Sequence, residues 1–296
     1  MTPREIKQIL VVGAGTMGHQ IALAAALAGY RVKCADPSDQ ALKRAGNFVE
    51  VYLPQRLDQG KITPEAARRG RDNLEFTRDL EGAAGQADLV IESIPEVLDL
   101  KRQMFSRLDR LCPEHTILAT NSSFIVSSRL ADATGRPDRV CNMHFFNPPV
   151  YMKPVEVVKG PHVSEETALT LVEVCRKMGK IPFLLHKEVP GFLINRVLAA
   201  THREALFLYD LGVASIEDID KAIQYGLGHT IPPFRQMDLI GLDLNLSIAM
   251  EHYRETGDPK LKPSPILVEK VARGELGRKT GKGFYDYAEM LAERGY

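Results

Sequence analysis

Two side chains near the middle of the chain could together carry out acid–base chemistry. His144 lies in the apolar run VCNMHF (140–145), and Glu156 follows twelve residues later in the run PVEVV (154–158). A histidine can take up and release a proton near neutral pH. A carboxylate in an apolar strand is costly to bury unless it has a partner, and an adjacent imidazole would be one. We therefore predict that Glu156 orients His144 and makes it more basic, although a histidine at a strand end can also be purely structural.

A glycine-rich loop near the N-terminus predicts a dinucleotide site. The loop follows the strand-like run ILVV (9–12), leads directly into a helical run, and reads Gly13-Ala14-Gly15-Thr16-Met17-Gly18. In such a loop the first glycine allows a tight turn, the second lets a pyrophosphate approach the backbone, and the third lets helix and strand pack closely. The helix N-terminus favours the phosphate charge. A glycine-rich turn that binds no ligand is the alternative.

The acidic residue that such a site needs is also present. The run RVKCA (31–35) reads as the second strand and is followed by Asp36. This is near the ~20-residue offset at which a carboxylate accepts hydrogen bonds from the adenosine ribose hydroxyls. Because the same carboxylate would repel a 2′-phosphate, we predict that the cofactor is NAD in preference to NADP.

These residues need a scaffold, and the chain has the pattern of one. Short β-rich runs alternate with longer helical patterns, and they lie at 9–12, 31–35, 74–77, 89–93, 116–120, 140–145, 154–158 and 181–185. This alternation predicts an α/β fold with a largely parallel, doubly wound sheet of the Rossmann type. In such a sheet the carboxyl ends of the strands form the ligand crevice, where His144 would lie.

The strand patterns stop after about residue 187, and the remainder of the chain reads as helix. We therefore predict two domains, a Rossmann-type NAD-binding domain at 1–187 and a smaller all-helical domain at 188–296. The second domain would serve substrate binding and dimerisation. A helical domain of ~100 residues presents considerable apolar surface, so we expect a homodimer.

Several helix boundaries can be predicted from their end residues. Thr63 and Pro64 should open a helix that Gly70 stops. Pro190 should start a long helix through about residue 211, and Ser215 should cap the next one. Further amphipathic patterns cover about 233–256 and 264–273.

Composition narrows the range of partners. Lys plus Arg and Asp plus Glu each number 38, so no basic field exists to attract nucleic acid or anionic lipid. The four cysteines form no Cys-x-x-Cys pair, which predicts neither a metal site nor a disulfide framework. There is no signal-peptide core, and no run approaches the ~18 apolar residues of a membrane helix. We expect a soluble, cytoplasmic protein.

Two longer motifs carry a resemblance to a known family. HFFNPPVYMKPVEVV (144–158) and PGFLINR (190–196) resemble the signatures of 3-hydroxyacyl-CoA dehydrogenases. The likeness continues through IESIPE (91–96), NSS (121–123), EDIDKAIQYGLG (217–228), MDLIGLD (237–243) and GRKTGKGFYDY (277–287). The length and the segment TGDPKLKPSP (256–265) are most similar to the short-chain members. The resemblance implies hydride transfer between NAD(H) and C3 of a 3-hydroxyacyl-CoA, with 3-hydroxybutyryl-CoA and acetoacetyl-CoA as the expected pair.

The resemblance also implies roles for single residues. His144 would be the acid/base and Glu156 its partner, while Ser123 and Asn195 would hold the substrate oxygen. The implied cofactor contacts, beside the glycine loop and Asp36, are Glu96, Lys101, Ser123, Asn147 and Lys279. Without the resemblance, Ser123 would be read as a turn residue, Asn195 as a surface residue, and both lysines as solvated.

Contacts to coenzyme A are harder to assign. Lys61 is a candidate substrate contact, within a segment that also holds Arg56, Arg68, Arg69 and Arg71, but alternating charges are also typical of a solvated helix face. The family commonly has Gly-Pro-Phe where this chain has Pro232-Pro-Phe. Proline removes a hydrogen-bond donor and restricts the backbone of this loop.

Two other functions compete with this interpretation. A dehydrogenase of a free hydroxy acid, such as gulonate or carnitine, would share the fold. The resemblance suggests that such relatives usually carry a more apolar or proline-containing segment where this chain has Met152-Lys153. A non-catalytic nucleotide-binding or structural protein could keep the fold without turnover. The presence of His144, Glu156, Ser123 and Asn195 together argues against the latter.

Overall fold

A computed structural model describes residues 4–288 of the chain. The chain divides into two compact units, Met1–Leu193 and Ile194–Tyr296. Within the described residues, no helix has both the length and the apolarity needed to cross a bilayer.

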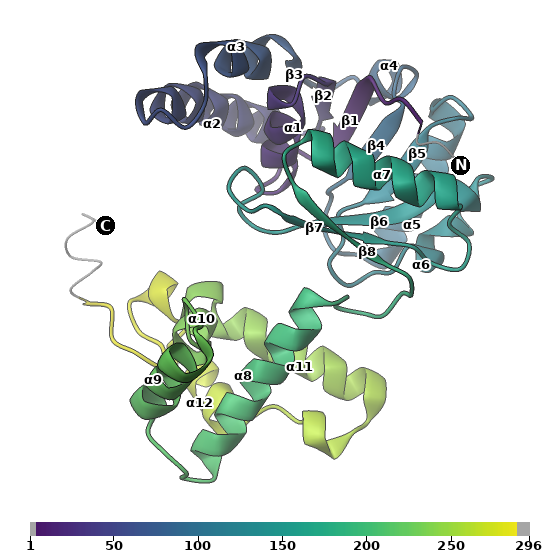
Figure 1. The fold of residues 1–296 in the computed structure, drawn as a ribbon. Helices are drawn as coiled ribbons and strands as arrows, with labels where there is room; N and C mark the ends of the chain where they lie inside the picture. Colours follow the sequence, from purple (N-terminus) through teal and green to yellow (C-terminus); the bar gives the residue numbers. More distant parts are fainter. Residues whose placement is uncertain (1–3, 289–296) are drawn as a thin grey trace. The chain divides into compact units, whose positions relative to one another are not determined.

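The first unit is built on one eight-stranded sheet (Figure 1). Its strands are β1 (Gln8–Val12), β2 (Arg31–Ala35), β3 (Leu74–Thr77), β4 (Leu89–Glu92), β5 (Ile117–Thr120), β6 (Val140–Phe145), β7 (Pro154–Val158) and β8 (Ile181–Leu185). They lie in the order β3-β2-β1-β4-β5-β6-β7-β8. Strands β1 to β6 run parallel, β7 is antiparallel to β6, and β8 is parallel to β7. The predicted α/β class with a doubly wound, largely parallel sheet is confirmed.

Helices cover both faces of this sheet. Val11 and Ile91 pack with residues of α1 (Gly18–Leu27) and α7 (Glu165–Lys177), and α7 lies across the sheet in Figure 1. Their neighbours Val12 and Val90 point to the opposite face. That face is covered by α4 (Leu80–Ala84), α5 (Leu98–Leu111) and α6 (Ser128–Ala131). Because the central strands are buried on both sides, their sequences are almost continuously apolar.

The segment between β2 and β3 corrects one predicted boundary. It forms α2 (Asp39–Asp58) and α3 (Pro64–Asp72), and the Thr63 hydroxyl caps α3 as predicted. Gly70, however, does not stop α3. It is buried inside the helix, where a Cβ would lie 2.9 Å from the side chain of Leu27 in α1. The prediction of a helix stop was wrong because this glycine lets α3 pack closely on α1.

The second unit is helical, as predicted. Its helices are α8 (Ile194–Asp210), α9 (Ile216–Leu227), α10 (Pro233–Ile240), α11 (Leu242–Thr256) and α12 (Pro265–Ala272). Its core includes the fully buried side chains of Phe234, Met237 and Leu242. The Ser215 hydroxyl caps α9 by accepting the N–H of Asp218 at 3.1 Å.

Two predicted helix boundaries in this region were wrong. Pro190 does not start α8, because Gly191 and Phe192 adopt positive φ values of 77° and 48° and form a turn before Ile194. The pattern at 233–256 is two helices, separated where Gly241 has a φ of 107°. In both cases the proline or glycine alone did not predict the backbone conformation around it.

Candidate active site

His144 and Glu156 face each other across two adjacent strands. They are direct partners in the antiparallel register of β6 and β7, and Nδ1 of His144 lies 2.8 Å from Oε2 of Glu156. Both residues are buried, Glu156 completely. The histidine ring packs against the rings of Phe146 and Phe192, with centroids 4.5 and 5.6 Å away. The predicted pairing of the two side chains is therefore present in the fold.

This arrangement controls which ring nitrogen of His144 can act. When Nδ1 carries a hydrogen and donates it to Glu156, Nε2 keeps its lone pair and can accept a proton. A buried carboxylate in this position can also stabilise a positive charge on the ring, as in a catalytic triad. The second oxygen of Glu156, Oε1, accepts the backbone N–H of Leu193 at 3.0 Å. Each carboxylate oxygen of Glu156 thus has a hydrogen-bond partner, so the carboxylate is held in one orientation beside the ring.

The glycine loop has the shape of a cradle for an anion. Gly13 has a φ of 101°, and a Cβ there would lie 2.6 Å from the carbonyl oxygen of Ser93. A Cβ on Gly18 would lie 1.8 Å from the carbonyl oxygen of Gly13, so neither position can hold a side chain. A Cβ on Gly15 would meet no protein atom within 4 Å. The loop is therefore closed toward the protein and open at Gly15, directly before the N-terminus of α1, which suits a pyrophosphate.

Asp36 is connected to this loop. Its carboxylate accepts the backbone N–H of Ala14 at 2.8 Å and that of Ser38, also at 2.8 Å. The acid at the end of β2 is therefore fixed beside the loop that follows β1. The residues present fit a dinucleotide, with the phosphates at the loop and the adenosine ribose at Asp36.

Two more predicted site residues lie beyond β4. The side chain of Glu96 is 42% exposed, and that of Lys101, on α5, is 1% exposed. The ammonium of Lys101 lies 2.7 Å from Oε1 of Glu92 and 3.2 Å from Oε2 of Glu96. The alternative of a solvated lysine is therefore wrong for Lys101.

Ser123 and Asn147 follow the ends of neighbouring strands. Ser123 is half-buried in the turn after β5, and Asn147 is exposed just after β6. The amide oxygen of Asn121 accepts the N–H of Phe145 at 2.9 Å and so joins the turn of Ser123 to the strand of His144. The sheet thus brings the glycine loop, Ser123, Asn147 and the His144 pair to one edge.

Comparison with known proteins identifies the family. A family model described as the 3-hydroxyacyl-CoA dehydrogenase NAD binding domain matches residues 8–189, and a model of the C-terminal domain of the same family matches 191–287. The chain belongs to the 3-hydroxyacyl-CoA dehydrogenase family. It is an NAD-dependent oxidoreductase, and its glycine loop lies in an NAD-binding domain.

Relatives in this family align over almost the whole chain. The probable 3-hydroxybutyryl-CoA dehydrogenase of Bacillus subtilis strain 168 is 42% identical over 97% of this chain and 100% of its own. The mitochondrial hydroxyacyl-coenzyme A dehydrogenase of Rattus norvegicus is 39% identical over 95% of this chain and 91% of its own. The crystal structure of (S)-3-hydroxybutyryl-CoA dehydrogenase from Ralstonia eutropha superposes with a TM-score of 0.90 at 36% identity, covering 96% of this chain and 99% of that one.

Three predicted site residues of this 3-hydroxyacyl-CoA dehydrogenase come from other elements of the chain. Asn195 is half-buried at the start of α8, in the helical unit. Lys279, in the same unit, is half exposed and lies 2.6 Å from both carboxylate oxygens of Asp243. Lys61 is exposed between α2 and α3. Their assigned contacts remain predictions.

Two buried residues beside the site were not predicted. Glu92, at the end of β4, is completely buried, and Asn121 bridges β5 and β6. The signal that pointed to Glu156, a carboxylate in an apolar strand, is equally present in LVIE (89–92) and would have found Glu92. Asn121 has no comparable signal, since asparagine after a strand is usual in turns.

Proposed function

We propose that this chain interconverts 3-hydroxybutyryl-CoA and acetoacetyl-CoA with NAD(H). The observation that carries the proposal is the buried His144–Glu156 pair at the same sheet edge as the open glycine loop. The short acyl chain is supported by the names of the Bacillus subtilis and Ralstonia eutropha relatives and by their full-length match.

The residues would divide the reaction as follows. When bound at the glycine loop, NAD would supply the acceptor for the hydride of C3. Nε2 of His144 takes the proton of the C3 hydroxyl, and Glu156 stabilises the imidazolium that forms. Ser123 and Asn195 donate hydrogen bonds to the substrate oxygen and stabilise its negative charge as the carbonyl forms. In ketone reduction the same proton returns from Nε2 to the oxygen.

Five further contacts are proposed for the cofactor, from Glu96, Lys101, Ser123, Asn147 and Lys279, and one for coenzyme A, from Lys61. We also propose a homodimer formed mainly by the helical region 188–296 and a cytoplasmic location. The four buried, free thiols support a reducing compartment. The equal numbers of acidic and basic residues support the absence of nucleic-acid and membrane partners.

A spectrophotometric assay of NADH consumption tests the substrate. We expect acetoacetyl-CoA to be reduced with a higher kcat/KM than longer 3-ketoacyl-CoAs, and free acetoacetate to be reduced poorly. A preference for free acetoacetate would favour a hydroxy-acid dehydrogenase instead. NADH binding without turnover of any of these compounds would favour the non-catalytic alternative.

A further inference from the structure

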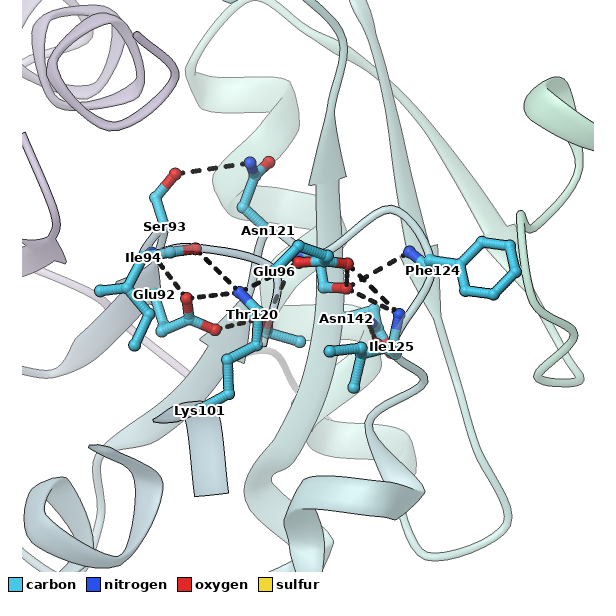
Figure 2. Close-up of polar contacts among 11 residues, drawn as sticks. Glu92, Ser93, Ile94, Glu96, Lys101, Thr120, Asn121, Phe124, Ile125 and Asn142 are labelled. Carbon is cyan, nitrogen blue, oxygen red and sulfur yellow. Dashed lines mark hydrogen bonds and ion pairs between the residues drawn. The ribbon is translucent and has the colours of Figure 1, made fainter. Parts of the chain in front are cut away.

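A closed ring of polar groups, all of them buried except Glu96, joins the ends of β4 and β5 (Figure 2). Oε1 of Glu92 accepts from the ammonium of Lys101 at 2.7 Å, and Oε2 accepts the hydroxyl of Thr120 at 2.7 Å. The Thr120 hydroxyl oxygen accepts the N–H of Ser122 at 3.1 Å. The ring closes because the Ser122 hydroxyl donates to Glu96, which is also the second carboxylate partner of Lys101.

The ammonium of Lys101 is surrounded by three acceptor oxygens inside this ring, two bound by hydrogen bonds and one by an ion pair. An ammonium has three N–H groups, and its nitrogen lies 2.7 Å from Glu92, 3.1 Å from the carbonyl oxygen of Ile94 and 3.2 Å from Glu96. Its side chain is 1% exposed, whereas that of Glu96 is 42% exposed. Glu96 is therefore the more exposed carboxylate of this cluster, and Lys101 holds it from the buried side.

The ring also fixes the turn that carries Ser123. The Ser122 hydroxyl oxygen accepts the N–H of Ile125 at 2.7 Å. The carbonyl oxygen of Ile125 in turn accepts from the side-chain amide of Asn142 in β6 at 2.9 Å. Because Ser123 lies inside this turn, its position depends on Thr120 and Ser122 on one side and on the strand of His144 on the other.

We propose that Glu92 is a positioning residue for hydride transfer. Through Lys101 it holds Glu96 on the cofactor side, and through Thr120 and Ser122 it holds the turn of Ser123 on the substrate side. We call these two roles the cofactor branch and the substrate branch. The substrate branch rests on the proposed function, whereas the cofactor branch concerns NADH binding alone. In this arrangement Lys101 also positions Glu96, in addition to its proposed place in the cofactor site.

The competing explanation is that Glu92 and Lys101 form a purely structural ion pair. Variants that disturb or keep the charge balance of this pair distinguish the two explanations. Lys101→Met leaves the buried Glu92 carboxylate unpaired, which should lower the melting temperature by about 10 °C. The double variant Glu92→Gln/Lys101→Met removes both charges, and stability should largely return, since a neutral pair of similar size does not carry the desolvation cost. In this double variant Glu96 still lacks the Lys101 ammonium that holds it. We expect the double variant to bind NADH about tenfold more weakly in a fluorescence titration.

Arg102→Met is the matched control for this branch. Arg102 neighbours Lys101 on α5 and pairs with Asp132 at 2.7 Å, but this pair is at the surface. Its loss should leave both the melting temperature and the NADH Kd close to wild type. A double variant that has regained stability and binds NADH with wild-type affinity would show that the pair is only structural. Failure of the double variant to regain stability would contradict the charge-balance argument itself.

The substrate branch has its own pair of variants. Thr120→Val removes the hydroxyl that links Glu92 to Ser122 but leaves the charges of the ring in place. It should lower kcat for acetoacetyl-CoA about tenfold while NADH binding stays within twofold of wild type. Thr116→Val is the control, because Thr116 is equally buried, directly precedes β5 and donates to the carbonyl of Ala87 at 2.6 Å. It should lose a similar amount of stability without the kinetic defect.

The outcomes distinguish a failure of the positioning role of Glu92 from a failure of the proposed function. Equal kinetic effects of Thr120→Val and Thr116→Val would overturn the substrate branch. If the wild-type chain binds NADH but does not reduce acetoacetyl-CoA, the proposed substrate is wrong. The NADH affinity of the double variant still decides the role of Glu92 and Lys101 in that case.

Discussion

Leu193 donates its backbone N–H to the same carboxylate that holds His144, at 3.0 Å from Oε1 of Glu156. A Glu156→Gln variant can keep this bond, because an amide oxygen also accepts. Its NH2 group would then face Nδ1 of His144 and favour the tautomer with the hydrogen on Nε2, which cannot accept the substrate proton. We expect kcat to fall by a factor on the order of 10² or more, with the NADH Kd unchanged.

His144→Gln should cost at least as much in kcat as Glu156→Gln. If the two residues act as one unit, as proposed, the double variant should be little worse than the poorer single variant. Steady-state kinetics on the three variants form a double-mutant cycle. Losses that multiply would mean that Glu156 has a separate role.

Asp36 should determine the preference for NADH over NADPH. Replacing it with Ser removes the ribose acceptor and the repulsion of a 2′-phosphate, so the ratio of kcat/KM for NADH to that for NADPH should fall. The loss of the bond from Ala14 should also raise the KM for NADH, because this bond joins Asp36 to the glycine loop. Kinetics with both cofactors test this, and an unchanged ratio would exclude Asp36 as the discriminating residue.

The stability of the helical unit should fall in mild acid because of His202. Its ring is buried between Asn245 and Gln236, with ring nitrogens 3.2 and 3.4 Å from their amide oxygens, and burial lowers its pKa from 6.5 to about 4. Between these values the unfolded chain binds a proton that the folded chain does not. Stability is therefore complete above about pH 6.5 and decreases as the pH falls toward 4, by about 3 kcal/mol in all.

Urea unfolding of the wild type and of His202→Leu at several pH values measures this contribution. The variant should lose less stability than the wild type over the same interval. Parallel losses in the two proteins would assign the acid sensitivity to other groups.

The cysteines should be unreactive in the folded chain. Burial raises the pKa of Cys34 and Cys175 to about 12 and that of Cys112 to about 11, and it raises the pKa of Cys141 as well. At about pH 8 all four are then thiols shielded from reagents. Iodoacetamide should label all four in urea and none in buffer, as counted by mass spectrometry. Labelling of one cysteine without unfolding would show that its site opens locally.

The helical unit should form the dimer. It carries large exposed apolar side chains, among them Phe207 (52% exposed), Leu211 (62%), Tyr225 (81%) and Leu227 (70%). Light scattering at micromolar concentration should give twice the mass of one chain. Glu substitutions at these four positions, tested singly, should include at least one that yields the monomer. A wild-type monomer with full activity would refute the dimer.

Sequence patterns predicted all eight strands, because each is a short apolar or β-branched run between turn residues. They also predicted the glycine loop, which has a fixed position relative to β1 and α1. They did not predict the burial of Lys101, since a lysine on an amphipathic helix is usually solvated and its partner Glu92 lies on a strand. The misplaced stop at Gly70 has the same origin, because contacts between α3 and α1 are not visible in local sequence.

The reversed direction of β7 has a consequence for folding. His144 and Glu156 are twelve residues apart in sequence, on adjacent antiparallel strands. Closing such a short loop costs little chain entropy compared with the long crossovers that bring β1, β4 and β5 together. His144 and Glu156 can therefore meet through one local β-pairing step, independently of the order in which the parallel strands assemble.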